Sequence, residues 1–332
     1  MTRTLLRAVF FAALSTPNSI GFAQQAPTAR RLIADKVRAS VVVEGAMDSD
    51  LLRPGLLTAH GRSVIVFDYG DHSVKAFDSV GSLSWKFGRQ GAGPSEFSNP
   101  VDLATSPDGK VWISDPPNAR VTVLSPSGSL LYMLPVRAEL ERVVPLRSGA
   151  FFGVSYSRDK PVFAYFDSAG RERRKIAHPS WLDSIPTLVS ELRLASSPDR
   201  DWIAIGSHYS GRLMRTEREK SEMVEMNAVE KHPFPVPISF SPRAGMTVRR
   251  FPPSARSTIR SLAADKRFVY ALVSGRTPQR GRLVDRYRLA DGAYVDSFAL
   301  PRVADAISIA ACGLAFLVSD PLPAIHCAPI IR

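Results

Sequence analysis

The sequence lacks the short motifs that place catalytic groups or phosphates in common enzyme folds. It contains no G-x-x-x-x-G-K-[ST] phosphate loop, no H-E-x-x-H zinc motif and no G-x-S-x-G nucleophile elbow. Gly88, Gly91 and Gly93 are spaced G-x-x-G-x-G rather than G-x-G-x-x-G, and no helical pattern follows them. No helix N-terminus is therefore expected there to receive a phosphate, and these glycines are interpreted as turn residues.

Long apolar runs are also missing. The run Ala8–Leu14 is far shorter than the roughly 20 residues of a membrane-spanning helix. It follows the basic residues Arg3 and Arg7 and precedes a Gly-Phe-Ala tripeptide with small residues at the cleavage positions. This pattern predicts a cleaved export signal over residues 1–23 and a short linker over 24–31, hence a periplasmic or secreted protein of a bacterium without an integral membrane segment.

Cysteine is scarce, with only Cys312 and Cys327 in the chain. The midpoint between them falls in the turn-like sequence SDPLPA, and the flanking segments have the pattern of strands. The two cysteines therefore lie symmetrically about a turn, where cross-strand partners are found. In an exported protein an even count favours a disulfide, and two unpaired thiols are the alternative.

Acidic residues are outnumbered, and the formal net charge is +12. An excess of this size is compatible with nucleic acid, an anionic membrane surface or an acidic glycan as a partner. The arginines are scattered and mixed with acids, and no RNA-binding module or basic helix with interleaved aromatics is present. Nucleic acid is therefore not expected as a partner, and an anionic glycan remains a weaker hypothesis.

A repeat is visible in the first half of the chain. The segment Val64–Leu83 (VIVFDYGDHSVKAFDSVGSL) aligns without a gap with Val111–Leu130 (VWISDPPNARVTVLSPSGSL) at an offset of 47 residues. Each copy has a β-rich run ending in Asp, a polar turn, a second alternating run and a glycine turn, which is typical of two paired strands. Strand-only repeats of 40–50 residues predict a β-propeller with one four-stranded blade per repeat.

The length from residue 32 to 332 accommodates six blades in a single all-β domain. The last blade has room for only three strands. The isolated strand pattern Ala39–Glu44 is predicted to complete it, which removes an exposed sheet edge. The expected blades begin near Leu56, Pro100, Leu140, Leu192, Ile259 and Ala306.

The segment Gly88–Gly128 resembles an NHL repeat, the blade of NHL six-bladed propellers. The resemblance extends to the preceding blade, over roughly residues 56–135, and is degenerate elsewhere. Pro116 and Pro117 stand where the family usually has a small polar residue. The matching positions are Gly88, Gly91, Gly93, Phe97, Pro100, Asp108-Gly109, Ser114-Asp115, Asn118, Arg120 and Val121.

Three polar residues are predicted to stabilise turns by side-chain hydrogen bonds to the backbone, namely Asp68, Asp115 and Arg120. In a propeller, the loops between blades share one face with the loops between the second and third strands. This face is where we expect a ligand, although ordinary solvated loop residues are the alternative. The predicted ligand-binding residues are Tyr69, His72, Arg89, Gln90, Glu96 and Asn118.

These features predict a monomeric binding module that recognises a protein, peptide or cell-envelope component through loops at one mouth of the propeller, without catalysis or a cofactor. The alternative is a metal-dependent hydrolase or lyase resembling lactonases, with calcium or zinc in the central channel. The sequence has few residues suited to ligate such a metal, because it contains only four asparagines and its six histidines follow no metal-ligand spacing. No metal-ligating residue is therefore assigned.

Overall fold

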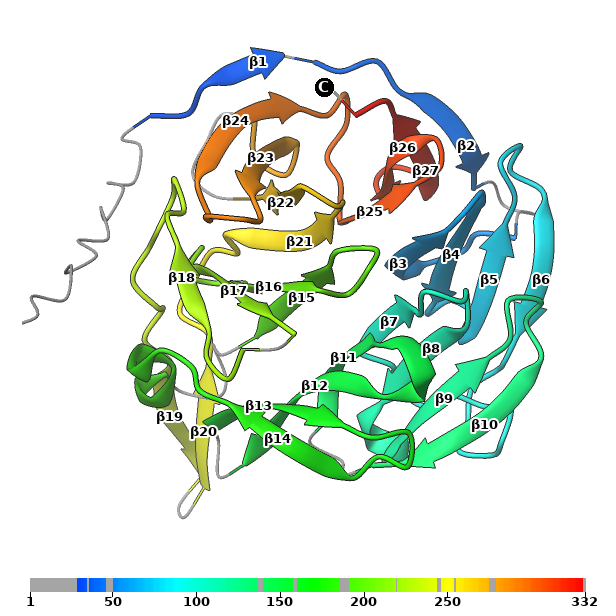
Figure 1. The fold of residues 1–332 in the computed structure, drawn as a ribbon, viewed down its shortest axis with the longest axis horizontal. Coiled ribbons are helices and arrows are strands. Elements are labelled where there is room, and N and C mark those ends of the chain that lie inside the picture. The colour runs from blue at the N-terminus through cyan, green and yellow to red at the C-terminus, as the bar shows by residue number, and fades with distance from the viewer. Residues whose placement is uncertain are drawn as a thin grey trace, which may run out of the picture.

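Six four-stranded β-sheets are arranged radially around a central axis, as blades of a β-propeller (Figure 1). The structure is a computed structural model that describes residues 29–34, 36–45, 50–136, 140–157, 160–185, 191–218, 220–243, 246–253, 255–274 and 279–330. The predicted export signal lies outside the described residues. Three short 3₁₀ turns are η1 (Pro116–Asn118), η2 (Arg147–Gly149) and η3 (Ser180–Ser184).

The first three blades follow one another along the chain, each running from an inner strand beside the axis to an outer strand. Blade 1 has β3 (Pro54–His60), β4 (Ser63–Asp68), β5 (Ser73–Phe77) and β6 (Leu83–Phe87). Blade 2 has β7 (Asp102–Thr105), β8 (Val111–Asp115), β9 (Arg120–Leu124) and β10 (Leu130–Pro135). Blade 3 has β11 (Leu140–Pro145), β12 (Phe151–Ser157), β13 (Lys160–Phe166) and β14 (Glu172–Ile176).

The second half of the ring contains three further blades. Blade 4 has β15 (Leu192–Ser196), β16 (Trp202–Ser207), β17 (Leu213–Glu217) and β18 (Val224–Met226). Blade 5 has β21 (Ile259–Ala264), β22 (Phe268–Val273), β23 (Leu283–Arg288) and β24 (Tyr294–Ala299), with β1 (Leu32–Ala34) added in parallel to β24. Blade 6 has β25 (Ala306–Ala310), β26 (Gly313–Val318), β27 (Ala324–Ala328) and β2 (Ser40–Glu44).

The ring is closed by a strand from the other end of the chain. Strand β2 pairs antiparallel with β27, so that Ser40 lies opposite Cys327 and Glu44 opposite Ala324. The prediction that an N-terminal strand completes a three-stranded last blade is therefore confirmed. The chain also forms the predicted disulfide between Cys312 and Cys327, which joins the turn before β26 to β27.

The hydrophobic core lies between neighbouring blades. One cluster joins Phe67 and Val74 of blade 1 to Val111 and Ile113 of blade 2, and all four side chains are almost completely buried. Trp112 packs in the next cluster, against blade 3. Because each middle strand is covered on both faces, β4 and β8 are apolar almost throughout rather than strictly alternating.

An insertion lies between blades 4 and 5. The charged segment from residue 212 to 231 contains the strand pair β17 and β18, whereas the insertion follows it as a separate hairpin of β19 (Ile238–Arg243) and β20 (Met246–Arg250). Within the described ranges, no helix is long and apolar enough to cross a membrane.

Candidate functional site

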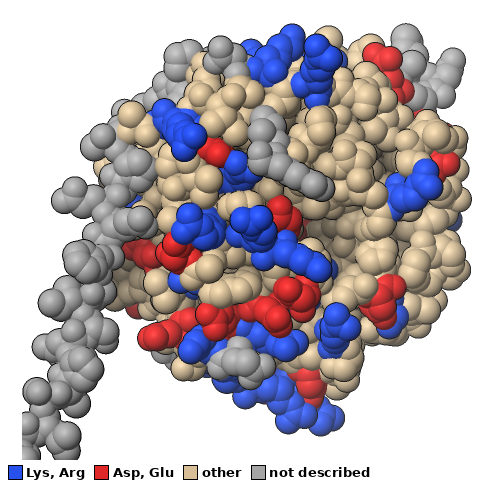
Figure 2. Space-filling view, turned by 45° about the horizontal axis from the view of Figure 1, so that its top comes forward, with Lys and Arg blue, Asp and Glu red and all other residues tan. Residues whose placement is uncertain are grey.

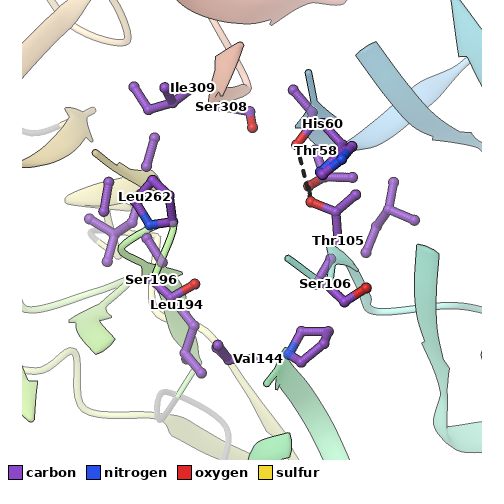
Figure 3. A pocket seen from close by; sticks show the side chains of 18 of the residues that line it. Thr58, His60, Thr105, Ser106, Val144, Leu194, Ser196, Leu262, Ser308 and Ile309 are labelled. Carbon is purple, nitrogen blue, oxygen red and sulfur yellow. Dashed lines mark hydrogen bonds between the residues drawn. The ribbon is translucent and has the colours of Figure 1, made fainter. Parts of the chain in front are cut away.

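The central channel contains two cavities, stacked along the axis. The upper cavity, at the end where the inner strands begin, has a volume of about 330 Å³. The lower cavity, at the end where the inner strands finish, has a volume of about 370 Å³ and is shown in Figure 3. Both cavities are bordered by the same middle belt of the inner strands, formed mainly by Leu57, Leu103, Leu194, Leu262 and Ile307.

Charged side chains gather around the upper cavity. Each comes from the first residues of an inner strand, or from the residue just before it, so blades 2 to 6 all contribute. Charged residues are tolerated there because the strand enters the apolar belt only one or two residues later. The charged lining residues are Asp102, Arg142, Glu191, Arg193, Arg260 and Asp305.

The arginines join one blade to the next. Arg193 Nη1 lies 2.6 Å from Glu191 Oε1, and Arg193 Nε donates a hydrogen bond to the carbonyl oxygen of Arg260 at 2.8 Å. Arg260 in turn pairs with Asp305 at 2.5 Å. The ring of charge is therefore ordered by contacts between blades 4, 5 and 6.

Arg142, in blade 3, joins its own blade to blades 2 and 4. Its guanidinium donates to the carbonyl oxygen of Leu192 in blade 4 at 3.0 Å and to that of Val101 at the start of blade 2. One of its terminal nitrogens lies 3.8 Å from Glu191. Only 7% of Arg142 is exposed, so its charge is held in the channel wall rather than in solvent.

Burial shifts the protonation equilibria of this ring and of two nearby groups outside it, Glu141 and His208. It raises the pKa of Asp102 and of Glu141, although the nearby charge of Arg142 opposes both shifts. Burial is the largest single influence on Glu191 and would raise its pKa, but the charges of Arg193, His208 and Arg142 and a hydrogen bond from Arg193 together lower it. Burial and the repulsion of Arg193 lower the pKa of His208 to about 4, so this imidazole is neutral near pH 7.

The upper cavity therefore presents fixed positive and negative groups in similar number. Such a cavity can bind a ligand that offers hydrogen-bond donors and acceptors at matching positions. Figure 2 shows basic and acidic residues next to one another on part of one face of the molecule. Among the described residues, no group of three or more His, Cys, Asp or Glu side chains is placed to hold a metal ion.

Three of the six ligand-binding residues predicted from sequence lie in the loop between β6 and β7, and their contacts are within that loop. Arg89 pairs with Glu96 at 2.8 Å, and Glu96 accepts a hydrogen bond from the Gly93 amide at 2.7 Å. Gln90 forms a β-bridge with Phe97. These contacts fold the loop upon itself.

The other three predicted ligand-binding residues differ in position. The Asn118 amide donates to the Gly91 carbonyl oxygen at 3.0 Å, which adds to the same loop. His72 has a positive φ of 53° and lies edge-on to the buried ring of Phe67. Tyr69 lines the upper cavity and donates from its hydroxyl to the Pro100 carbonyl oxygen at 2.6 Å, so it is the predicted residue that reaches the channel.

The three residues predicted to stabilise turns all bond to backbone groups. Asp68 accepts hydrogen bonds from the amides of Leu52, Arg53 and Gly70, each at 2.8 Å. In the next blade, Asp115 accepts from the amides of Ser98 and Asn99 at 2.9 and 3.0 Å. The guanidinium of Arg120 donates to the carbonyl oxygens of Ala92, Gly93 and Glu96.

No protein-family model matches this chain, and no curated protein matches it in sequence. Among solved structures it is similar to virginiamycin B lyase from Staphylococcus aureus, with a TM-score of 0.51, 12% identity, and coverage of 89% of this chain and 99% of that chain. It is also similar to a member of the DUF4221 family from Bacteroides vulgatus, with a TM-score of 0.54, 11% identity, and coverage of 88% and 98%.

A third similar structure is regucalcin from Agrobacterium tumefaciens, a calcium-binding protein, with a TM-score of 0.50, 12% identity, and coverage of 93% and 99%. At this level of identity the likeness supports the six-bladed propeller fold and carries no information on the ligand.

Sequence reasoning missed the arginines of the upper cavity. A signal was present, since three consecutive inner strands carry an arginine near their first residue, immediately before an apolar run: Arg142, Arg193 and Arg260. In the linear pattern each of them reads as an ordinary charge at a strand end. Their convergence becomes visible only when the blades are placed around one axis.

Proposed function

We propose that this protein is an exported, monomeric binding module that recognises a protein, peptide or cell-envelope component in the upper cavity of its channel. The observation that carries the proposal is the ring of paired charges supplied by five blades around a cavity of about 330 Å³. A peptide-like ligand, with both donors and acceptors, suits such a ring better than an apolar molecule or a simple polyanion.

The channel wall is suited to reversible binding because its polar groups are already ordered. The ion pair of Arg193 with Glu191 and that of Arg260 with Asp305 are formed in the protein alone. Because these side chains are already ordered, they lose little conformational freedom when a ligand binds. Recognition then requires no bond to be made or broken, and the mechanism is binding to a rigid ring.

Two observations support an exported location, periplasmic or extracellular. The Cys312–Cys327 disulfide is of a kind that persists in oxidising compartments, and the first residues have the pattern of a cleaved signal. The NHL-like character of blades 1 and 2 belongs to the same proposal, as it points to a propeller of the type that presents loops to partners.

The test compares Arg193→Gln with a matched control, Arg89→Gln. Each variant removes the arginine of an Arg–Glu ion pair, one in the upper cavity and one in the exposed loop between β6 and β7. Partners captured from a cell-envelope extract by the mature chain are identified, and their affinities are then measured by calorimetry. We expect Arg193→Gln to weaken binding about 10- to 100-fold, because it removes a charge-assisted contact, and Arg89→Gln to leave it unchanged.

The opposite pattern, with binding lost in Arg89→Gln alone, would overturn the upper cavity as the site and favour the loop predicted from sequence. Metal analysis of protein purified without chelator is done in parallel. About one calcium or zinc per chain, with stabilisation by the same ion, would favour the metal-dependent hydrolase or lyase instead.

A further inference from the structure

The lower cavity has a different chemical character from the upper one. Its walls are the final residues of the inner strands, and it combines an apolar belt with hydroxyl groups (Figure 3). The hydroxyls of Thr58 and Thr105 lie 3.4 Å apart and face each other. Those of Ser196 and Ser308 point into the space between the strands, and neither forms a hydrogen bond within the described part of the chain.

One arginine lies at the wall of this cavity in an unusual backbone conformation. Arg200, in the turn between β15 and β16, has a φ of 65°. The same turn in blade 2 has the sequence Ser-Pro-Asp-Gly, and its glycine, Gly109, has a φ of 82°. Blade 4 keeps Ser-Pro-Asp but places Arg200 where the left-handed conformation favours glycine. A non-glycine residue in this conformation strains the backbone, so we expect contacts of the Arg200 side chain that offset the strain.

The Arg200 guanidinium reaches across the end of the channel to two other blades. Its Nε donates to the carbonyl oxygen of Pro145 in blade 3 at 3.0 Å, and Nη2 donates to that of Thr105 in blade 2. A third hydrogen bond, from Nη1, goes to the carbonyl oxygen of Ser197 in its own turn at 3.0 Å. The turn that carries Arg200 projects toward the axis of the ring (Figure 1).

These three acceptors are neutral, and the neighbouring carboxylate of Asp199 compensates the charge of Arg200 only in part, opposing the fall in its pKa. No carboxylate in the described part of the chain forms an ion pair with it, and burial lowers its pKa to about 10, which leaves it cationic at neutral pH. The guanidinium has five N–H groups, and three are used. Asp102, at the other end of β7, also borders the lower cavity, about 10 Å along that strand from Thr105, and burial raises the pKa of its carboxyl group.

We propose that the lower cavity is a second, independent binding site, for a small organic anion with a carboxylate head and a short apolar chain. The carboxylate is bound by the free N–H groups of Arg200 and by the hydroxyl of Ser196, which precedes the turn that carries Arg200. The apolar chain lies against the belt, at Leu194 and Leu262. The volume of about 370 Å³ is in the range of small-molecule sites.

The anion adds a counter-charge to that of Asp199, and this contact together with the three carbonyl hydrogen bonds gives a reason for an arginine at a glycine position. Guanidinium also matches a carboxylate geometrically, since its N–H groups are planar and can donate in pairs.

The experiment titrates the mature protein with hexanoate and with hexanamide, its neutral analogue, by calorimetry and NMR. We expect saturable binding of hexanoate at one site, with a Kd near or below about 1 mM. We expect hexanamide to bind at least about 10-fold more weakly, because it lacks the charge. No saturable binding of hexanoate, or equal binding of both compounds, would overturn the proposal.

Three variants locate the site. Arg200→Gly restores the Ser-Pro-Asp-Gly turn of blade 2, so the turn is expected to fold, and hexanoate affinity should fall about 10-fold or more. Arg147→Gln removes a positive charge from an exposed residue in the equivalent turn of blade 3, and its affinity should stay within about twofold. Ser196→Ala serves as a second test, with an expected loss of about threefold to tenfold.

If Arg200→Gly binds hexanoate as the unchanged protein does, the assignment to the lower cavity is wrong. This experiment needs no protein partner and leaves the upper cavity unchanged. Its failure is therefore distinguishable from failure of the proposed peptide-binding function.

Discussion

Removing the disulfide by the double substitution Cys312→Ala and Cys327→Ala tests how the ring is closed. The bond spans a sequence separation of 15 residues. In the chain-entropy description, a disulfide that closes a loop of this length reduces the entropy of the unfolded chain, which destabilises the unfolded state by about 3 kcal/mol. For a propeller of about 300 residues, the entropy of unfolding is about 0.6 kcal/mol/K, so Tm should fall by about 5 °C. Cys327 lies in β27, opposite Ser40 of β2. The stabilisation is therefore lost in blade 6, where strands from both ends of the chain pair.

Differential scanning calorimetry of the unchanged protein and the variant measures this difference. Reductant added to the unchanged protein should lower its Tm by a similar amount without altering any side-chain packing, whereas the variant should not respond. A variant that melts within about 1 °C of the unchanged protein would refute the reasoning, because it would mean that the reduced, unfolded chain is already restricted to the same extent.

Further predictions concern buried charges. Lys75 and Asp68 form an almost fully buried ion pair at 2.9 Å, so Lys75→Met should destabilise the protein by about 3–5 kcal/mol in chemical denaturation; a loss below about 1 kcal/mol would contradict the burial argument. His208 should titrate near pH 4 by NMR, and its pKa should rise in Arg193→Gln, which removes a repelling charge, and fall in Glu191→Gln; a pKa near 6.5 in the folded protein would contradict its position. Because the unfolded imidazole binds its proton near pH 6.5 and the folded one near pH 4, His208 should reduce stability progressively as pH falls from about 6.5 to about 4.

Much of the fold was readable from local sequence, because each blade is a local unit. Strands within a blade are joined by short turns, so the spacing of apolar runs, Asp-Gly steps and glycine turns marks them directly. The predicted blade starts near Leu140, Leu192, Ile259 and Ala306 coincide with the first residues of β11, β15, β21 and β25. The closure by Ala39–Glu44 was also predictable, since a strand without a local partner was available for a blade that lacked one.

The candidate site was only partly predictable. Tyr69 was chosen because of the face its loop occupies, and it does line the upper cavity. The loop residues Arg89 and Glu96 were chosen by the same argument, but they pair with each other. Sequence gives the face on which a loop lies, because that depends on strand order. It does not give the distance of a side chain from the axis, because that depends on how the loop folds.

The sequence by itself determined the repeat, the number of blades, the strand that closes the ring and the cysteine pair, since each depends on spacing along the chain. The tertiary structure alone decided the two cavities. Asp102, Arg142, Arg193, Arg260 and Asp305 come from five blades, and they meet because packing between blades arranges them around one axis. The same holds for Arg200, whose partners Thr105 and Pro145 belong to other blades. Contacts between distant segments also set burial, and burial sets the charge of these groups, so neither follows from the spacing of residues in the chain.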